Sequence, residues 1–124
     1  MYLFSFEKLE VWQNSRVFIL EIYRLTIAFP SHELFGITSQ IKRSSSSIAT
    51  NIAEGTSRNT NKDKAHFLTI SYFSAMETLN HLILSKDLNY ISEQEYIQCL
   101  EKLEKICNQI NNLKKYYLSQ EQIR

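Results

Sequence analysis

The sequence predicts an all-α protein, an antiparallel up-and-down four-helix bundle that occupies residues 1–124 as a single domain. Glycine occurs twice and proline once, which leaves too few turn-forming residues for a β-sandwich or a barrel. Apolar residues recur at alternating spacings of three and four, the pattern of helices that pack along a common seam. The polar breaks between the helical segments are short, so consecutive helices are expected to run antiparallel.

The first predicted helix covers about residues 6–29. It ends before Pro30, because proline disfavours the helical conformation of the residue that precedes it. At 100° per residue, its apolar residues form two faces that are about 130° apart. One face holds Leu9, Trp12, Ile19, Tyr23 and Ile27, and the other holds Val11, Phe18, Ile22, Leu25 and Phe29.

Two apolar faces on one helix need two neighbours. In one interpretation, the adjacent helices of the same chain cover both faces. In the other, the second face belongs to a subunit interface, because monomers rarely expose large contiguous apolar patches. The second interpretation predicts an oligomer interface that contains Val11, Phe18, Leu25 and Phe73.

The second predicted helix covers about residues 32–58, with Ser31 as its N-cap. Polar side chains, including four consecutive serines, stand along this helix where leucines are expected in a bundle. In one interpretation they form a satisfied internal network that specifies one packing of the helices. In the other they line a groove for a ligand or nucleic acid. The predicted network consists of Gln40, Ser47, Asn51, Glu54 and Glu77.

The third and fourth predicted helices cover about residues 61–88 and 92–118. Thr60 and Asp63 form a start signal that resembles a capping box for the third helix. The fourth helix begins with the S-x-x-E capping box of Ser92 and Glu95.

The charge of the chain is nearly balanced, with 14 basic and 13 acidic residues. No basic tail is present, so a nucleic-acid site would have to be assembled by folding or by the symmetry of an oligomer. The longest strictly apolar run, Val17 to Leu20, is far shorter than the roughly 20 residues that a membrane span requires. The first residues also lack the pattern of a secretory signal. The sequence therefore predicts a cytoplasmic protein without membrane contact.

The sequence contains no recognisable catalytic or metal-binding constellation. No local signature marks a serine or cysteine nucleophile, and two isolated glycines cannot form a phosphate-binding loop. A di-iron bundle needs paired E-x-x-H repeats, whereas the nearest candidates are Asp63 with His66 and Glu77 with His81. We therefore expect no enzymatic activity, no metal, no cofactor and no small-molecule substrate.

Cys99 and Cys107 are predicted to be small buried hydrophobic residues. They lie in one predicted helix, where their Cα atoms would be ~12 Å apart. This distance excludes a mutual disulfide.

Four stretches carry a resemblance to a known family. They are FEKLEVWQNS (residues 6–15), FPSHELFGITSQIKRS (29–44), SIATNIAEG (47–55) with Arg58, and HFLTIS (66–71) with Glu77. With these stretches the chain resembles the 23S rRNA intervening-sequence protein family, from Phe6 to about Tyr117. In the third helix that family usually shows an Arg-Gly-Ser step, where this chain has Tyr72, Phe73 and Ser74.

The resemblance implies a bacterial four-helix bundle that assembles as a homopentamer. Members of the family are encoded within insertions in rRNA genes or as stand-alone genes. Distant relatives, the accessory variability proteins of retroelements, are similar in fold and bind nucleic acid and a reverse transcriptase through basic surfaces.

The expected function is that of a non-enzymatic, oligomeric interaction or scaffold protein. The alternative is an accessory protein that binds RNA through basic surfaces of the oligomer. The expected partners are further copies of the chain, together with RNA or another protein. The residues predicted to contact RNA are Arg43, Arg58, Lys62 and Lys64.

Overall fold

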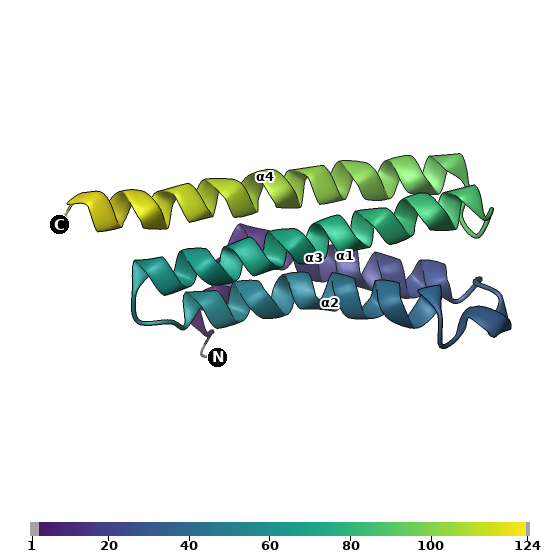
Figure 1. The fold of residues 1–124 in the computed structure, drawn as a ribbon, viewed down its shortest axis with the longest axis horizontal. Coiled ribbons are helices and arrows are strands. Elements are labelled where there is room, and N and C mark those ends of the chain that lie inside the picture. The colour runs from purple at the N-terminus through teal and green to yellow at the C-terminus, as the bar shows by residue number, and fades with distance from the viewer. Residues whose placement is uncertain (1–2, 124) are drawn as a thin grey trace.

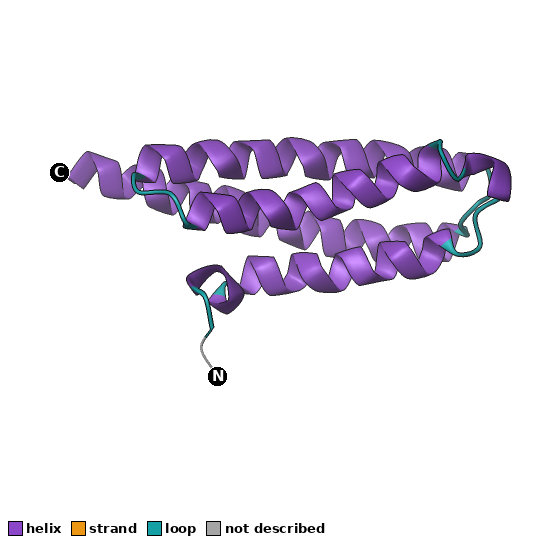
Figure 2. Ribbon diagram, turned by 90° about the horizontal axis from the view of Figure 1, so that it is seen from below, coloured by secondary structure: helices purple, strands orange, loops and turns teal. Residues whose placement is uncertain are grey.

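The computed structural model describes residues 3–123, and side chains up to residue 120, as an elongated bundle of four α-helices (Figure 1). The helices are α1 (Glu10–Thr26), α2 (Ile37–Thr56), α3 (Asn61–Asp87) and α4 (Glu93–Ile123). Consecutive helices run antiparallel, and Figure 2 shows that short connections join them at the two ends of the bundle. The C-terminal end of α4 extends past the α2–α3 turn. This architecture confirms the predicted fold class.

The core lies along the axis of the bundle, and all four helices contribute to it. Its largest fully buried side chains include Phe18 and Ile22 of α1, Ile48 and Ile52 of α2, Leu68 and Leu82 of α3, and Leu103, Ile106 and Ile110 of α4. Cys99 and Cys107 are buried too, as the sequence predicts.

The start of the first helix differs from the prediction. A separate 3₁₀ helix, η1 (Ser5–Lys8), precedes α1, and the backbone at Leu9 is extended, with ψ of 127°. The Glu7 carboxylate accepts a hydrogen bond from the Phe4 N–H at 3.1 Å, and the Phe6 ring packs edge-on against Trp12 with 5.0 Å between centroids. This folded-back segment replaces the first turn of the predicted helix.

The second helix begins at Ile37 rather than near residue 32, so Ser31 is not its N-cap. Ser31–Glu33 instead form a short 3₁₀ helix, η2, within the α1–α2 connection. The Glu33 carboxylate accepts a hydrogen bond from the Ile37 N–H at 3.4 Å. It therefore supplies from outside the helix the acceptor that an N-cap side chain normally provides.

The local start signals of α3 and α4 are confirmed. Thr60 Oγ1 accepts a hydrogen bond from the Asp63 N–H at 3.1 Å. Ser92 and Glu95 form the reciprocal capping box, with distances of 3.0 Å and 2.9 Å. α4 continues to Ile123 rather than ending near residue 118.

Of the two apolar faces of α1, the one that the sequence assigned to a subunit interface lies inside the chain. Val11, Phe18 and Leu25 retain only 5%, 0% and 6% of their exposure, so assigning them to a subunit interface was wrong. The other three helices cover this face inside the chain. On the other face, Leu9 and Trp12 pack against the core, whereas Tyr23 and Ile27 are exposed.

Candidate interaction surfaces

Hydroxyl groups line the seam between α2 and α3. Ser71 donates a hydrogen bond to the Ile48 carbonyl at 2.8 Å. Thr78 Oγ1 and Ser44 Oγ lie 2.8 Å apart, and Ser74 Oγ and Ser47 Oγ lie 2.9 Å apart. We call these residues, together with Asn51, the α2–α3 hydroxyl seam.

The predicted polar network is present in part. Asn51 donates to the Ser47 carbonyl at 2.9 Å and to Ser47 Oγ at 3.0 Å, which places both residues in the seam. Gln40 and Glu54 are exposed, and among the described residues neither side chain forms a hydrogen bond with the seam. Glu77 lies outside it, with its carboxylate 3.5 Å from both Arg43 and His81.

Close approach of the two helices explains the small residues of the seam. A Cβ atom added at Gly55 would lie 2.9 Å from the Phe67 Cβ atom and 3.3 Å from the Lys64 carbonyl oxygen. Glycine gives the backbones room to approach at this point. Sequence reasoning missed Ser71, Ser74 and Thr78, although their spacing of three and four on one helix was a usable signal. The seam is a packing device rather than an open groove.

Three of the four residues predicted to contact RNA gather around the α2–α3 turn. The Arg58 guanidinium lies 4.3 Å from the centroid of the Phe67 ring. Lys64 Nζ donates to the Thr56 carbonyl at 2.8 Å and lies 5.5 Å from the Tyr117 ring of α4. Lys62 is exposed in the first turn of α3. We call Arg58, Lys62 and Lys64 the basic turn.

Arg43 does not belong to the basic turn. It lies 15 residues before Arg58, a distance of ~22 Å along the helix axis. There its guanidinium lies 3.5 Å from the Glu77 carboxylate of α3, and both side chains are exposed. The four predicted contacts therefore do not all lie at the α2–α3 turn.

A second surface carries several exposed apolar side chains, among which the exposed Arg16 and Arg24 also stand. It runs along the outward side of α1 and continues on the α1–α2 connection. Leu20 keeps 63% of its exposure, Ile27 84% and Phe35 91%. We call Val17, Leu20, Tyr23, Ile27, Leu34 and Phe35 the α1 apolar surface. Of the residues predicted for the oligomer interface only Phe73, on α3, is exposed.

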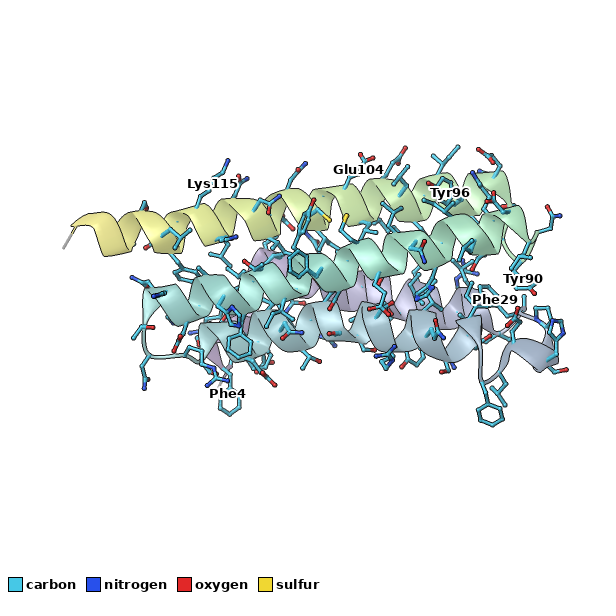
Figure 3. The ribbon with its side chains drawn as sticks, in the orientation of Figure 1. Phe4, Phe29, Tyr90, Tyr96, Glu104 and Lys115 are labelled. Atoms are coloured by element: carbon cyan, nitrogen blue, oxygen red, sulfur yellow. The ribbon has the colours of Figure 1, made fainter. Side chains whose placement is uncertain are left out.

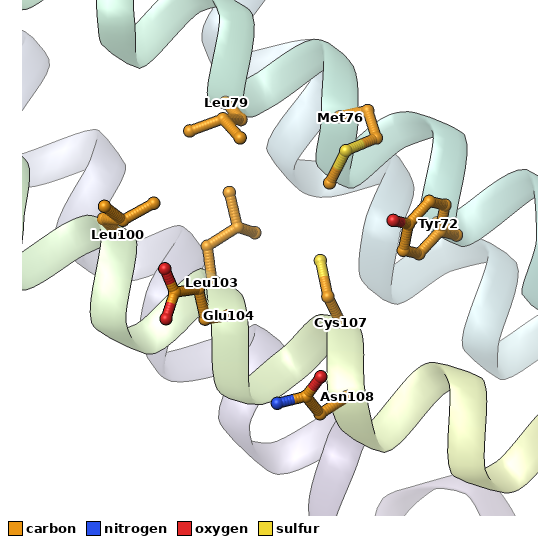
Figure 4. A pocket seen from close by; sticks show the side chains of 8 residues that line it. All are labelled: Tyr72, Met76, Leu79, Leu100, Leu103, Glu104, Cys107 and Asn108. Carbon is orange, nitrogen blue, oxygen red and sulfur yellow. The ribbon is translucent and has the colours of Figure 1, made fainter.

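A cavity of about 270 Å³ lies between α3 and α4 (Figure 4). Its lining consists of Tyr72, Met76, Leu79, Leu100, Leu103, Glu104, Cys107 and Asn108. Burial raises the pKa of the Cys107 thiol to about 11, and the nearby Glu104 carboxylate adds to this effect. A nucleophilic cysteine needs a lowered pKa, so this thiol is not activated.

Both cysteines should resist alkylation in the folded protein. Burial raises the pKa of Cys99 and of Cys107 to about 11, so both remain protonated thiols at pH 8. Labelling with iodoacetamide at pH 8 can be followed by mass spectrometry. In the time that fully labels the urea-unfolded chain, we expect neither cysteine of the folded protein to be labelled. Rapid labelling of the native protein would contradict this burial.

The same shifts predict a dependence of stability on pH. The pKa of each thiol is higher in the folded than in the unfolded chain, where it is near 9. The two protonated thiols therefore make their full contribution to the free energy of unfolding below pH 9, and this contribution is lost as the pH rises toward 11. Between pH 9 and 11, the free energy of unfolding measured by urea denaturation should fall less for a Cys99→Ala/Cys107→Ala variant than for the wild type.

The described residues contain no cluster of three or more histidine, cysteine or acidic side chains arranged to hold a metal ion. Within residues 3–123, no helix has the length and apolar character needed to cross a membrane.

The fold and its surfaces define the class of protein: an antiparallel four-helix bundle with a hydroxyl-rich seam, a basic turn and an exposed apolar surface. The family model for the 23S rRNA-intervening sequence protein matches residues 7–112. The chain therefore belongs to this family, which confirms the resemblance seen in the sequence.

A solved structure supports the same assignment. It is described as a protein with unknown function from the S23 ribosomal protein family of Bacteroides thetaiotaomicron VPI-5482. The two chains share 25% sequence identity with a TM-score of 0.78, over 85% of this chain and 95% of that chain. No curated protein matches the sequence.

Proposed function

We propose that this protein is a non-enzymatic interaction module that works as a homo-oligomer. The observation that carries the proposal is the α1 apolar surface, where Leu20, Ile27 and Phe35 are more than half exposed. Burying a large aliphatic or aromatic side chain contributes roughly 1.5–3 kcal/mol. Covering several such residues at once is a substantial driving force for association. The resemblance to the family favours a pentamer.

A charged substitution on this surface should separate the copies. We expect a Leu20→Glu/Ile27→Glu variant to sediment as a single chain at concentrations where the wild type is associated. Both residues are exposed, so the helical signal in circular dichroism should be unchanged. Ile97→Glu, an exposed position on α4, is the matched control and should keep the wild-type mass. If the double variant kept the wild-type mass, the α1 apolar surface would not be part of the interface between copies.

A second candidate function is RNA binding at the basic turn. Arg58 and Lys64 each stand against an aromatic ring, and Lys62 adds a third cation at the same end of the bundle. Cations that contact phosphates, combined with aromatic rings that stack on bases, are typical of surfaces that bind single strands. The nearly neutral charge of one chain limits the affinity, and an oligomer would multiply the number of basic turns.

RNA binding can be tested by its dependence on salt. Each phosphate contact to a single strand contributes roughly 0.7 to the slope of log affinity against log salt. An Arg58→Gln/Lys62→Gln variant should therefore reduce the slope measured with an rRNA fragment by roughly 1.4 per chain engaged. Lys102→Gln on α4 is the control and should leave the slope unchanged. Absence of binding by the wild type at low salt would exclude this candidate.

A further inference from the structure

The α1–α2 connection presents Leu34 and Phe35 to solvent from a braced loop. The Tyr90 hydroxyl, which belongs to the α3–α4 connection, donates to Glu33 Oε2 at 2.8 Å. The other oxygen of Glu33 accepts the Ile37 N–H. The Tyr90 ring also packs against Phe29 with 5.4 Å between centroids (Figure 3).

The backbone of this loop is tightly turned as well. Successive hydrogen bonds join the Glu33 N–H to the Pro30 carbonyl, the Leu34 N–H to the Ser31 carbonyl and the Gly36 N–H to the Glu33 carbonyl, at 2.9–3.2 Å. A Cβ atom at Gly36 would lie 2.5 Å from Glu33 Oε1, so glycine makes room for the bracing carboxylate. The loop thus fixes the backbone at Phe35, whose ring is 91% exposed. Preorganisation of this kind lowers the entropy lost on binding.

The α1–α2 pair also contains a groove near its other end. This groove has a volume of about 450 Å³. Trp12 and Ile19 of α1 face Ala49 and Ala53 of α2 across it, and Phe6 closes one end. The small alanine side chains leave space for an incoming ring. Among the described residues that line it, Glu54 alone is charged, and the Arg16 guanidinium lies 5.8 Å from the centroid of the Trp12 ring.

The loop and the groove each carry a charged residue, and the two charges are opposite in sign. Lys42 lines the same surface hollow as Ile27 and Leu34, so a cation accompanies the protruding side chains. Glu54 supplies the matching carboxylate at the groove. Ile19 and Ile27 are eight residues apart in sequence, which is ~12 Å of helix, and Phe35 follows beyond Ile27. A chain therefore cannot insert its own Phe35 into its own groove.

We propose that Leu34 and Phe35 of one copy dock into the α1–α2 groove of a second copy, which places Lys42 of the first near Glu54 of the second. This proposal rests on the proposed self-association and names the two surfaces that meet. Because the two surfaces differ, the contact either repeats around a ring or occurs twice in an antiparallel pair.

Disulfide trapping between two variants tests this contact. A Leu34→Cys chain mixed with a Thr50→Cys chain retains Phe35 and places one thiol at the loop and one at the groove. The native Cys99 and Cys107 are buried, and burial raises the pKa of each thiol to about 11, so we expect neither to compete at pH 8. In the control, a Glu101→Cys chain, with its thiol on the exposed side of α4, replaces the Thr50→Cys chain. Under mild oxidation we expect the Leu34→Cys and Thr50→Cys pair to form mixed disulfides at least tenfold faster than the control pair. Equal rates with both partners would overturn the proposal.

Two further variants separate docking from chance collision. Adding Phe35→Ala to the Leu34→Cys chain should reduce the trapping rate severalfold, because the docking ring is gone. Tyr90→Phe keeps Phe35 but removes the brace on Glu33, and it should reduce trapping as well. If the wild type associates but Phe35→Ala changes neither mass nor trapping, this contact is wrong while self-association stands. If the wild type sediments as a single chain, the proposed function fails first.

Discussion

Replacing Phe18 by alanine should lower the free energy of unfolding by about 3–5 kcal/mol. The Phe18 side chain has 0% exposure and packs among apolar residues from all four helices. Its removal loses the transfer free energy of the ring and leaves a cavity that the helices fill only in part. Urea denaturation followed by circular dichroism measures the change.

Phe73 provides a control of the same residue type. It is 64% exposed on α3, and exposed substitutions usually change stability by less than about 0.5 kcal/mol. Phe73→Ala should therefore leave the urea midpoint nearly unchanged. If the two variants lost similar amounts of free energy of unfolding, Phe18 would not be a buried core residue.

Enlarging Ser71 should have the second largest effect. Its side chain is fully buried and donates to the Ile48 carbonyl of α2. Ser71→Ala removes one hydrogen bond, which costs about 1 kcal/mol. Ser71→Leu also forces apart two closely packed helices, and overpacking adds about 1–3 kcal/mol. We expect the leucine variant to be much the less stable of the two in urea denaturation.

Gln40→Leu is the matched control on α2. Gln40 is exposed and lies outside the hydroxyl seam, although the sequence suggested that it joined the polar network. Its replacement should change stability by less than about 0.5 kcal/mol. A stabilised Ser71→Leu protein would show that the seam is looser than its short hydrogen bonds indicate.

Signals that act within a few residues allowed the fold to be predicted. The caps at Thr60 and Ser92 use residues three positions away, so the sequence alone places the starts of α3 and α4. The start of α2 depends on Glu33, which Tyr90 holds from 57 residues away. No local pattern around Ser31 contains that information.

The surfaces were harder to predict than the helices. Periodicity shows that α1 has two apolar faces, but both faces have the same helical spacing. The packing of the other helices decides which face is buried inside the chain. The assignment of Val11, Phe18 and Leu25 to a subunit interface was wrong for this reason. The sequence places Arg43 and Arg58 in one predicted helix, but α2 ends at Thr56, before Arg58. Glu77 on the neighbouring helix contacts Arg43.

Self-association is the central claim, and sedimentation equilibrium of the wild-type chain over a wide range of concentrations tests it most directly. We expect a mass that is a multiple of the single-chain mass of 14.6 kDa, and five times that mass for a pentamer. A mass of 14.6 kDa at every concentration would contradict it.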